Sequence, residues 1–463
     1  MARLLWYRGE EWREVWDYWF KWTHEHLTSD DLRPMIYTYD ELGAKALDRL
    51  DEISPPVKPS TTPSEKVDTP QDAKSHRDLY ALLRDNADAD EALGKLWTEI
   101  NTVPPWVDWA QIERGQQVFL RYAGPAIFAH ILQVTRDLPS IQPGGEGHAS
   151  SVRVRLLHAA VRRRILLLAS QKPSYYDVAA YGVPVNDLDS IGTISTFSST
   201  LLWIGLPRQG IYLKDSEKED YLALWRYVAY IMGTPTSSFS TLTRAKATME
   251  TLLASEIQPS DTSRALANNV LTGLADQPPS HVSREFLAAE TYWLNGAKLA
   301  RALAVERPPF YYSLLILGQC LFFMFMCYSR RMFPGWDESR NKNLQKALFN
   351  LTVHKPELGA LGKETTFEFK YIPTLDVMST EAAARTQQQQ HPGTLTHEPG
   401  STAAAAKTEG AGARTGARAG ASTRRVRSNE RRSLMTLSVA VTVGGLLAWL
   451  GIRGASALVV RVL

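Results

Sequence analysis

The stretch Ser150–Ala169, SSVRVRLLHAAVRRRILLLA, decides the fold and leads to the candidate site. It carries one histidine and five arginines in an otherwise largely apolar sequence, and as a helix it would make about five and a half turns. Arg155, His158 and Arg162 are spaced three and four residues apart, so they share one helical face. Aliphatic residues cover most of the rest. The pattern predicts a helix that is buried on nearly every side and has one basic stripe.

The basic stripe has two interpretations, because a buried charge is costly unless an opposite charge meets it. In the first, the stripe meets a cofactor that combines a metal with carboxylates, such as haem with its propionates. In the second, a core histidine lies beside arginines that pair with the chain's own aspartates and glutamates. The residues leave both open, and the local pattern by itself favours the second.

Composition limits the class of protein. The 463 residues suit one large domain, or two with appendages. Lys and Arg (52) nearly balance Asp and Glu (49), so the chain as a whole is not suited to polyanions and no nucleic-acid partner is expected. Cys320 and Cys327 lie seven residues apart in one apolar run, about 10 Å along a helix, which is too far for a disulfide. Charges interrupt the first ten residues, so we expect no cleavable signal peptide.

The order of segments along the chain predicts a mainly α fold, because convincing alternating strands are scarce. Trp12, Trp16, Trp19 and Phe20 have helical spacing, which predicts an aromatic helix within an N-terminal region 1–52. Such a helix either docks on the core or anchors at a membrane interface. A Pro-rich linker over 53–75 precedes a helical domain over 76–378, and residues 379–433 form a basic, low-complexity linker that we expect to be disordered.

Two uncharged runs are long enough to interact with a bilayer. The run 310–328 is expected to be embedded in a membrane or buried as a core helix. The run 434–452 follows a cluster of arginines, which predicts a transmembrane tail anchor with the preceding chain in the cytosol. The sequence has no dinucleotide-binding or P-loop glycine motif, no H-E-x-x-H and no G-x-S-x-G. His130, which has apolar neighbours, is interpreted as a core residue.

Five blocks in order carry a family resemblance. They are SIQPGGEG (140–147), VRVRLLHAAVR (152–162), YGVPVND (181–187), GTISTFS (192–198) and YLALWRYVAY (221–230). Together they resemble the catalytic domain shared by bacterial latex-clearing rubber oxygenases and the fungal membrane-bound oxygenase of mycophenolic acid biosynthesis. The similarity covers roughly residues 106–328.

The resemblance implies a globin-like helical core with haem b, in which His158 is the iron ligand and Arg162 lies near a propionate. Arg155, on the same stripe, is a second candidate for cofactor binding. The implied reaction is the cleavage of a carbon–carbon double bond in a lipophilic, isoprenoid-type substrate by dioxygen. The expected location is a membrane, that of the endoplasmic reticulum, and the arginines before run 434–452 predict that the catalytic domain lies in the cytosol. No residue is assigned a catalytic role.

One departure from the family keeps other functions open. Family members carry an extra segment with distal polar residues between sequences resembling Arg121–Pro125 and His130–Thr135, whereas here a short stretch joins the two. A non-catalytic haem- or lipid-binding membrane protein is therefore the alternative function. A third hypothesis is an adaptor that uses the arginine-rich tract 412–425 to bind nucleic acid or anionic lipid.

Overall fold

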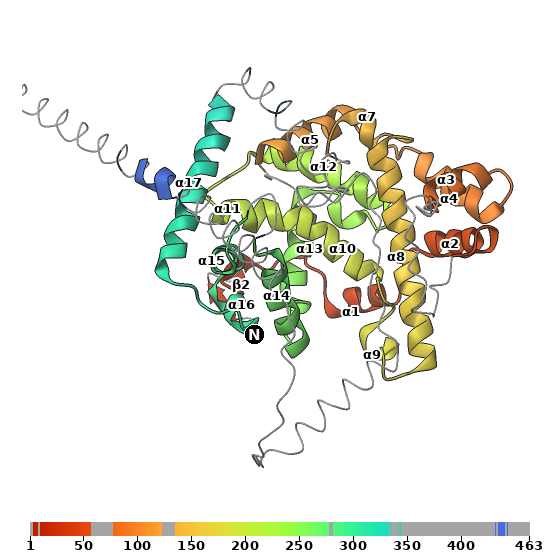
Figure 1. Cartoon of the computed structure of the whole chain (residues 1–463), viewed down its shortest axis with the longest axis horizontal. Helices are drawn as coiled ribbons and strands as arrows, with labels where there is room; N and C mark the ends of the chain where they lie inside the picture. Colours follow the sequence, from red (N-terminus) through yellow and green to blue (C-terminus); the bar gives the residue numbers. More distant parts are fainter. Residues whose placement is uncertain are drawn as a thin grey trace, which may run out of the picture.

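The protein is described by a computed structural model, which defines residues 3–7, 10–56, 77–122, 135–276, 281–332, 335, 341, 343, 431, 434–439 and 442. The described chain is mainly helical, so the predicted fold class is confirmed (Figure 1). His130, most of the predicted linkers and most of the predicted tail anchor over 434–452 lie outside these residues.

The elements follow one another from an N-terminal sheet to a long apolar helix. They are β1 (Arg3–Tyr7), β2 (Glu10–Val15), β3 (Tyr18–Lys21), α1 (Ser29–Leu32), η1 (Arg33–Ile36), α2 (Glu41–Ile53), α3 (Leu79–Asn86), α4 (Glu91–Asn101), α5 (Trp109–Tyr122), α7 (Leu138–Ile141), α8 (Glu146–Gln171), α9 (Val178–Tyr181), α10 (Asp187–Phe197), η2 (Leu201–Gly205), α11 (Leu206–Arg208), α12 (Asp215–Ile231), η3 (Ser237–Phe239), α13 (Leu242–Ser255), α14 (Asp261–Leu274), α15 (Arg284–Asn295), α16 (Ala297–Ala302) and α17 (Phe310–Met332).

The prediction of an aromatic helix at the N-terminus is wrong. Strands β1, β2 and β3 form a three-stranded antiparallel sheet in the order β1-β2-β3. Trp16 and Asp17 both have positive φ (50° and 62°) and make the two-residue turn between β2 and β3, a backbone geometry that matches the twist of a hairpin. Phe20 is buried on one face of β3 while Trp19 is exposed on the other, which is the alternation of a strand and not the stripe of a helix.

The main hydrophobic core joins segments from Leu32 to Cys327. Its centre is made of α5, α8, α10 and α12, where Leu156, Leu224 and Tyr227 are fully buried. Helices α2, α3 and α4 add their own apolar faces to the same cluster. Figure 1 shows α8 along one side of the molecule and α17 on the opposite side. The core therefore holds α8 in place along much of its length.

A second, smaller cluster joins α15 and α17. Phe286 and Ala289 of α15 pack against Leu315, Ile316 and Cys320 of α17. Within the described residues, one segment, Phe310–Ser329, is long and apolar enough to cross a membrane by length and composition. The prediction for run 310–328 left two environments open, and α17 has features of both, because one face packs on protein and another is exposed.

Candidate haem site on α8

Helix α8 displays the basic stripe that the sequence predicted. It begins after Gly145, at the end of a turn in which Gly144 has a φ of 85°. Val152, Leu156 and Ala159 are buried against the main core. The helix therefore has a fixed rotation about its axis, and this rotation sets where Arg155, His158 and Arg162 point.

Arg155 is held by the chain's own acceptors. Its Nε and Nη2 donate to the two carboxylate oxygens of Asp40, each at 2.7 Å, and Nη2 also lies 2.8 Å from a carboxylate oxygen of Glu99. Nη1 donates to the carbonyl of Ile231 at 3.3 Å. The side chain is 2% exposed, and although burial lowers its pKa, the two carboxylates raise it overall. The structure thus places Arg155 in the second role considered above, a core arginine paired within the protein.

The expected role of Arg155 in cofactor binding is therefore not carried forward. Its donors already face protein oxygens, and a propionate would have to displace Asp40 to reach them. Asp40 comes from the residue just before α2, where its side chain also accepts the Gly43 amide. This pair joins α8 to α2 across the core.

Arg162, two turns further along α8, has a different environment. Its Nε and Nη2 donate to the carbonyls of Pro184 and Val185, at 3.1 and 2.7 Å, and the guanidinium lies 4.5 Å from the ring centroid of Tyr39. Nη1 is buried and has no hydrogen-bond partner in the described part of the chain. Burial lowers the pKa of Arg162, and no described carboxylate lies within ion-pair distance. A buried guanidinium with an unused donor is suited to receive an anion.

His158 lies on α8 between the two arginines. No described residue forms a hydrogen bond with its ring, in contrast to His148, whose Nε2 donates to the carbonyl of Ile100 at 2.8 Å. Burial lowers the pKa of His158, the Arg162 guanidinium lowers it further, and Asp40 offsets part of this effect. The imidazole is therefore neutral near pH 7, and a neutral imidazole is the form that binds a metal.

These observations test whether the residues fit haem. A neutral histidine and, one turn later, a buried arginine whose Nη1 is unpaired match an iron ligand and a propionate partner, since neither the imidazole nor that donor has a hydrogen-bond partner among the described residues. The described residues contain no group of three or more His, Cys, Asp or Glu that could hold a bare metal ion. Haem needs one protein ligand and not such a group, so His158 and Arg162 fit it.

Sequence reasoning missed a second set of polar groups, in the last turn of α10 and just after it. The hydroxyls of Ser195 and Ser199 are buried and have no hydrogen-bond partner in the described residues. Directly after them, η2 is a π-helical turn, a geometry that often occurs at functional sites. The only sequence signal was the block 192–198, which includes Ser195 but does not show that the serines are buried.

Comparison with known proteins identifies an oxygenase family that the chain resembles. Residues 124–313 match the catalytic domain of an oxygenase family, which places the protein among the oxidoreductases. That family is described as "ER-bound oxygenase mpaB/B'/Rubber oxygenase, catalytic domain". His158 and Arg162 lie within the match. The resemblance read from the five sequence blocks is thereby confirmed.

Among solved structures, the chain is similar to that of latex clearing protein in the closed state. The sequence identity is 17% and the TM-score is 0.48, and the alignment covers 68% of this chain and 91% of the other. No curated protein matches the chain.

Proposed function

We propose that this protein is a membrane-associated, haem-dependent oxygenase that cleaves a carbon–carbon double bond of a lipophilic, isoprenoid-type substrate with dioxygen. The family match supports the oxygenase class, and the family's description names an ER-bound oxygenase and a rubber oxygenase. The observation that carries the proposal of haem binding is the pair formed by His158, which is neutral and has no hydrogen-bond partner among the described residues, and Arg162, which is buried and has a donor that no described residue accepts. We propose the endoplasmic reticulum as the location, with the catalytic domain in the cytosol.

Each residue of the pair has a defined task in this proposal. His158 binds the iron of haem b through an imidazole nitrogen, and its lowered pKa keeps that nitrogen unprotonated. Arg162 neutralises a propionate with its Nη1 donor, which has no partner among the described residues, while Pro184 and Val185 fix the guanidinium. Haem, when bound, supplies the iron at which dioxygen is activated.

The test is an absorption spectrum of the full chain purified in detergent and incubated with haem. We expect a Soret band in the wild type that is lost in H158A. H24A is the matched control, because the His24 side chain is 92% exposed and far from α8 in sequence, and it should keep the band. A wild type without a Soret band, or an H158A spectrum like that of the wild type, would contradict the proposal.

The alternative function is a haem- or lipid-binding membrane protein without oxygenase activity. The short connection between Pro125 and His130, where relatives carry distal polar residues, is the observation that favours it. Oxygen uptake with a prenylated substrate, together with aldehyde or ketone products, decides between the two. Haem binding without oxygen uptake would favour the alternative.

A further inference from the structure

One face of α17 is an exposed apolar surface. Phe310 is 75% exposed, Phe325 69% and Met332 73%, and Tyr311 and Phe322 are exposed as well. At 3.6 residues per turn these five side chains fall within an arc of about 120°. The arc runs the length of the helix. We call it the outer face of α17.

The opposite face of α17 is held by the folded domain at both ends. In the first half, Leu315 and Ile316 pack against Phe286 of α15. In the second half, Cys327 belongs to the main core cluster, and its thiol lies 3.5 Å from the carbonyl of Arg121 on α5. The helix therefore lies along the surface of the domain.

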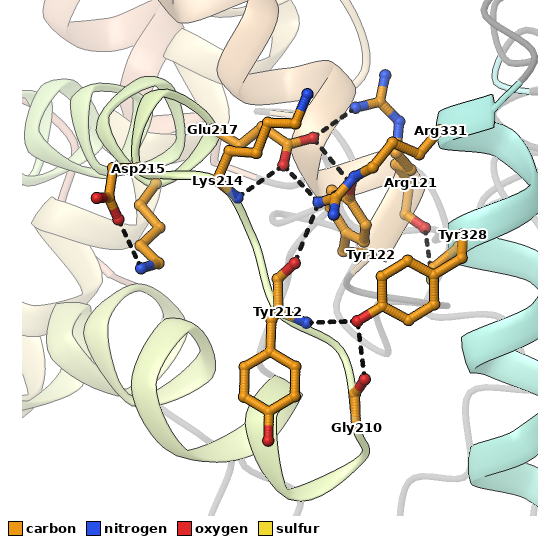
Figure 2. A network of polar contacts seen from close by, with 11 residues as sticks. Arg121, Tyr122, Gly210, Tyr212, Lys214, Asp215, Glu217, Tyr328 and Arg331 are labelled. Carbon is orange, nitrogen blue, oxygen red and sulfur yellow. Dashed lines mark hydrogen bonds and ion pairs between the residues drawn. The ribbon is translucent and has the colours of Figure 1, made fainter.

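A polar network fixes the C-terminal end of α17 (Figure 2). Glu217, near the start of α12, accepts from Arg331 at 2.7 Å, from Arg121 at 3.0 Å and from the hydroxyl of Tyr122 at 2.8 Å. Although burial raises the pKa of Glu217, these partners and the Lys214 amide lower it overall, so Glu217 stays ionised. Burial, with the Glu217 carboxylate, raises the pKa of Tyr122 to about 12.

A second contact lies one turn before Arg331 on α17. The hydroxyl of Tyr328 donates to the carbonyl of Gly210 at 2.9 Å and accepts the amide of Tyr212 at 3.1 Å (Figure 2). Gly210 has a φ of 78°, and a Cβ there would lie 2.7 Å from the sulfur of Met324. The loop before α12 and the end of α17 are thus in close contact, and their polar and charged groups are paired with each other.

We propose that α17 docks in the plane of a lipid surface, with its outer face in the headgroup and acyl boundary, and does not cross the bilayer. A spanning helix needs about 20 residues in hydrocarbon, which would remove Arg331 and Tyr328 from their partners and carry charged α15 and α12 into the membrane. An in-plane helix keeps every one of these contacts. The inference rests on the membrane association proposed above and specifies how it is made.

A second apolar segment identifies lipid as the occupant of this face. Leu434 packs against the α15–α17 cluster, and Met435 and Val439 beyond it are exposed. The sequence continues without charge to Ile452, so a membrane-seeking run begins beside α17. Arginines precede this run and suit anionic headgroups, and the aromatic residues of the outer face suit the interface.

The experiment measures labelling of single introduced cysteines by a membrane-impermeant maleimide, using the full chain with and without phosphatidylcholine–phosphatidylserine vesicles. F325C reports the outer face. L266C, on α14, is the matched control, since Leu266 is 62% exposed on another helix. E306C and N343C, both at exposed positions, report the two flanks of α17. The wild type gives the background of the buried Cys320 and Cys327.

We expect vesicles to slow F325C labelling by about tenfold, to leave L266C unchanged, and to leave both E306C and N343C reactive. Protection of one flank alone would show a spanning helix and overturn the proposal. F325C that stays reactive while the protein floats with vesicles would overturn it too, and would leave membrane association to another segment. Protein that does not float at all would refute membrane association as well, whereas an unchanged Soret band would leave the haem assignment standing.

Discussion

The same substitution should destabilise the protein strongly at Arg155 of the α8 stripe and only slightly at Arg162. In R155M, the carboxylate of Asp40, only 11% exposed, loses the guanidinium that binds both its oxygens. Breaking a buried pair by removing one partner costs about 3–5 kcal/mol. Glu99 is 38% exposed and adds little, because solvent screens that interaction. We expect R155M to lower the free energy of unfolding by about 3–5 kcal/mol.

In R162M, the outcome has two opposing parts. Two hydrogen bonds to the carbonyls of Pro184 and Val185 are lost, each worth about 1.5–3 kcal/mol. Removal of a buried cation that has no described carboxylate partner also removes its desolvation cost, which stabilises the folded protein by a similar amount. We therefore expect a net change within about 1.5 kcal/mol of the wild type. The same variant should weaken haem binding, whereas R155M should not once its folded fraction is taken into account.

The assay is urea unfolding of the haem-free protein followed by circular dichroism, together with haem titration of each variant. The control is D40N/R155M, which removes both charges of the pair and should recover part of the loss, because the cost of R155M lies mainly in the uncompensated carboxylate. Equal destabilisation by R155M and R162M, or a larger loss in R162M, would refute the assignment of different roles to the two arginines.

Three further predictions concern other parts of the fold. Burial lowers the pKa of His148 below the usual 6.5 despite its hydrogen bond to the Ile100 carbonyl, so the stability that His148 contributes should be complete above about pH 6.5 and fall as the pH drops below it. The free energy of unfolding should therefore depend less on pH in H148Q than in the wild type. Identical pH profiles would contradict this. E217Q should speed amide hydrogen exchange in the last turns of α17, because Arg121 and Arg331 lose their counter-ion. E219Q, at an exposed position, is the control and should leave the exchange rates unchanged. Equal exchange rates in the two variants would show that the network does not hold the helix. G182A should lower the free energy of unfolding, measured in urea, by about 2 kcal/mol or more, because residue 182 has a φ of 77° and a Cβ there would lie 2.3 Å from the carbonyl oxygen of Ile36. A decrease below about 0.5 kcal/mol would show that the turn relaxes.

Local pattern was sufficient to predict α8 and its stripe, because helical spacing and burial are encoded within the stretch itself. The partners of the stripe could not be predicted. Asp40 lies 115 residues before Arg155, and the carbonyls that bind Arg162 belong to a loop 22 and 23 residues after it. Only the tertiary structure distinguishes the paired Arg155 from Arg162, whose Nη1 has no partner among the described residues.

The N-terminal sheet shows where pattern reading fails. Aromatic residues at spacings of three and four satisfy a helical template, but they also occur on both faces of two short strands. The deciding feature is the Trp16–Asp17 turn, in which both residues have positive φ. Hairpin turns of this kind usually contain Asn-Gly or Asp-Gly, so the sequence carried no recognisable signal for it.

The position of Asp40 has a consequence for how much of the chain is needed to make the site. The family match begins at residue 124, whereas Asp40, Glu99 and Ile100, which hold α8 through Arg155 and His148, all precede it. A protein truncated to the matched residues would expose an unpaired guanidinium in its own core. Asp40 and the end of α4 are therefore structural supports of α8, and they should be retained in any shortened version used to test haem binding.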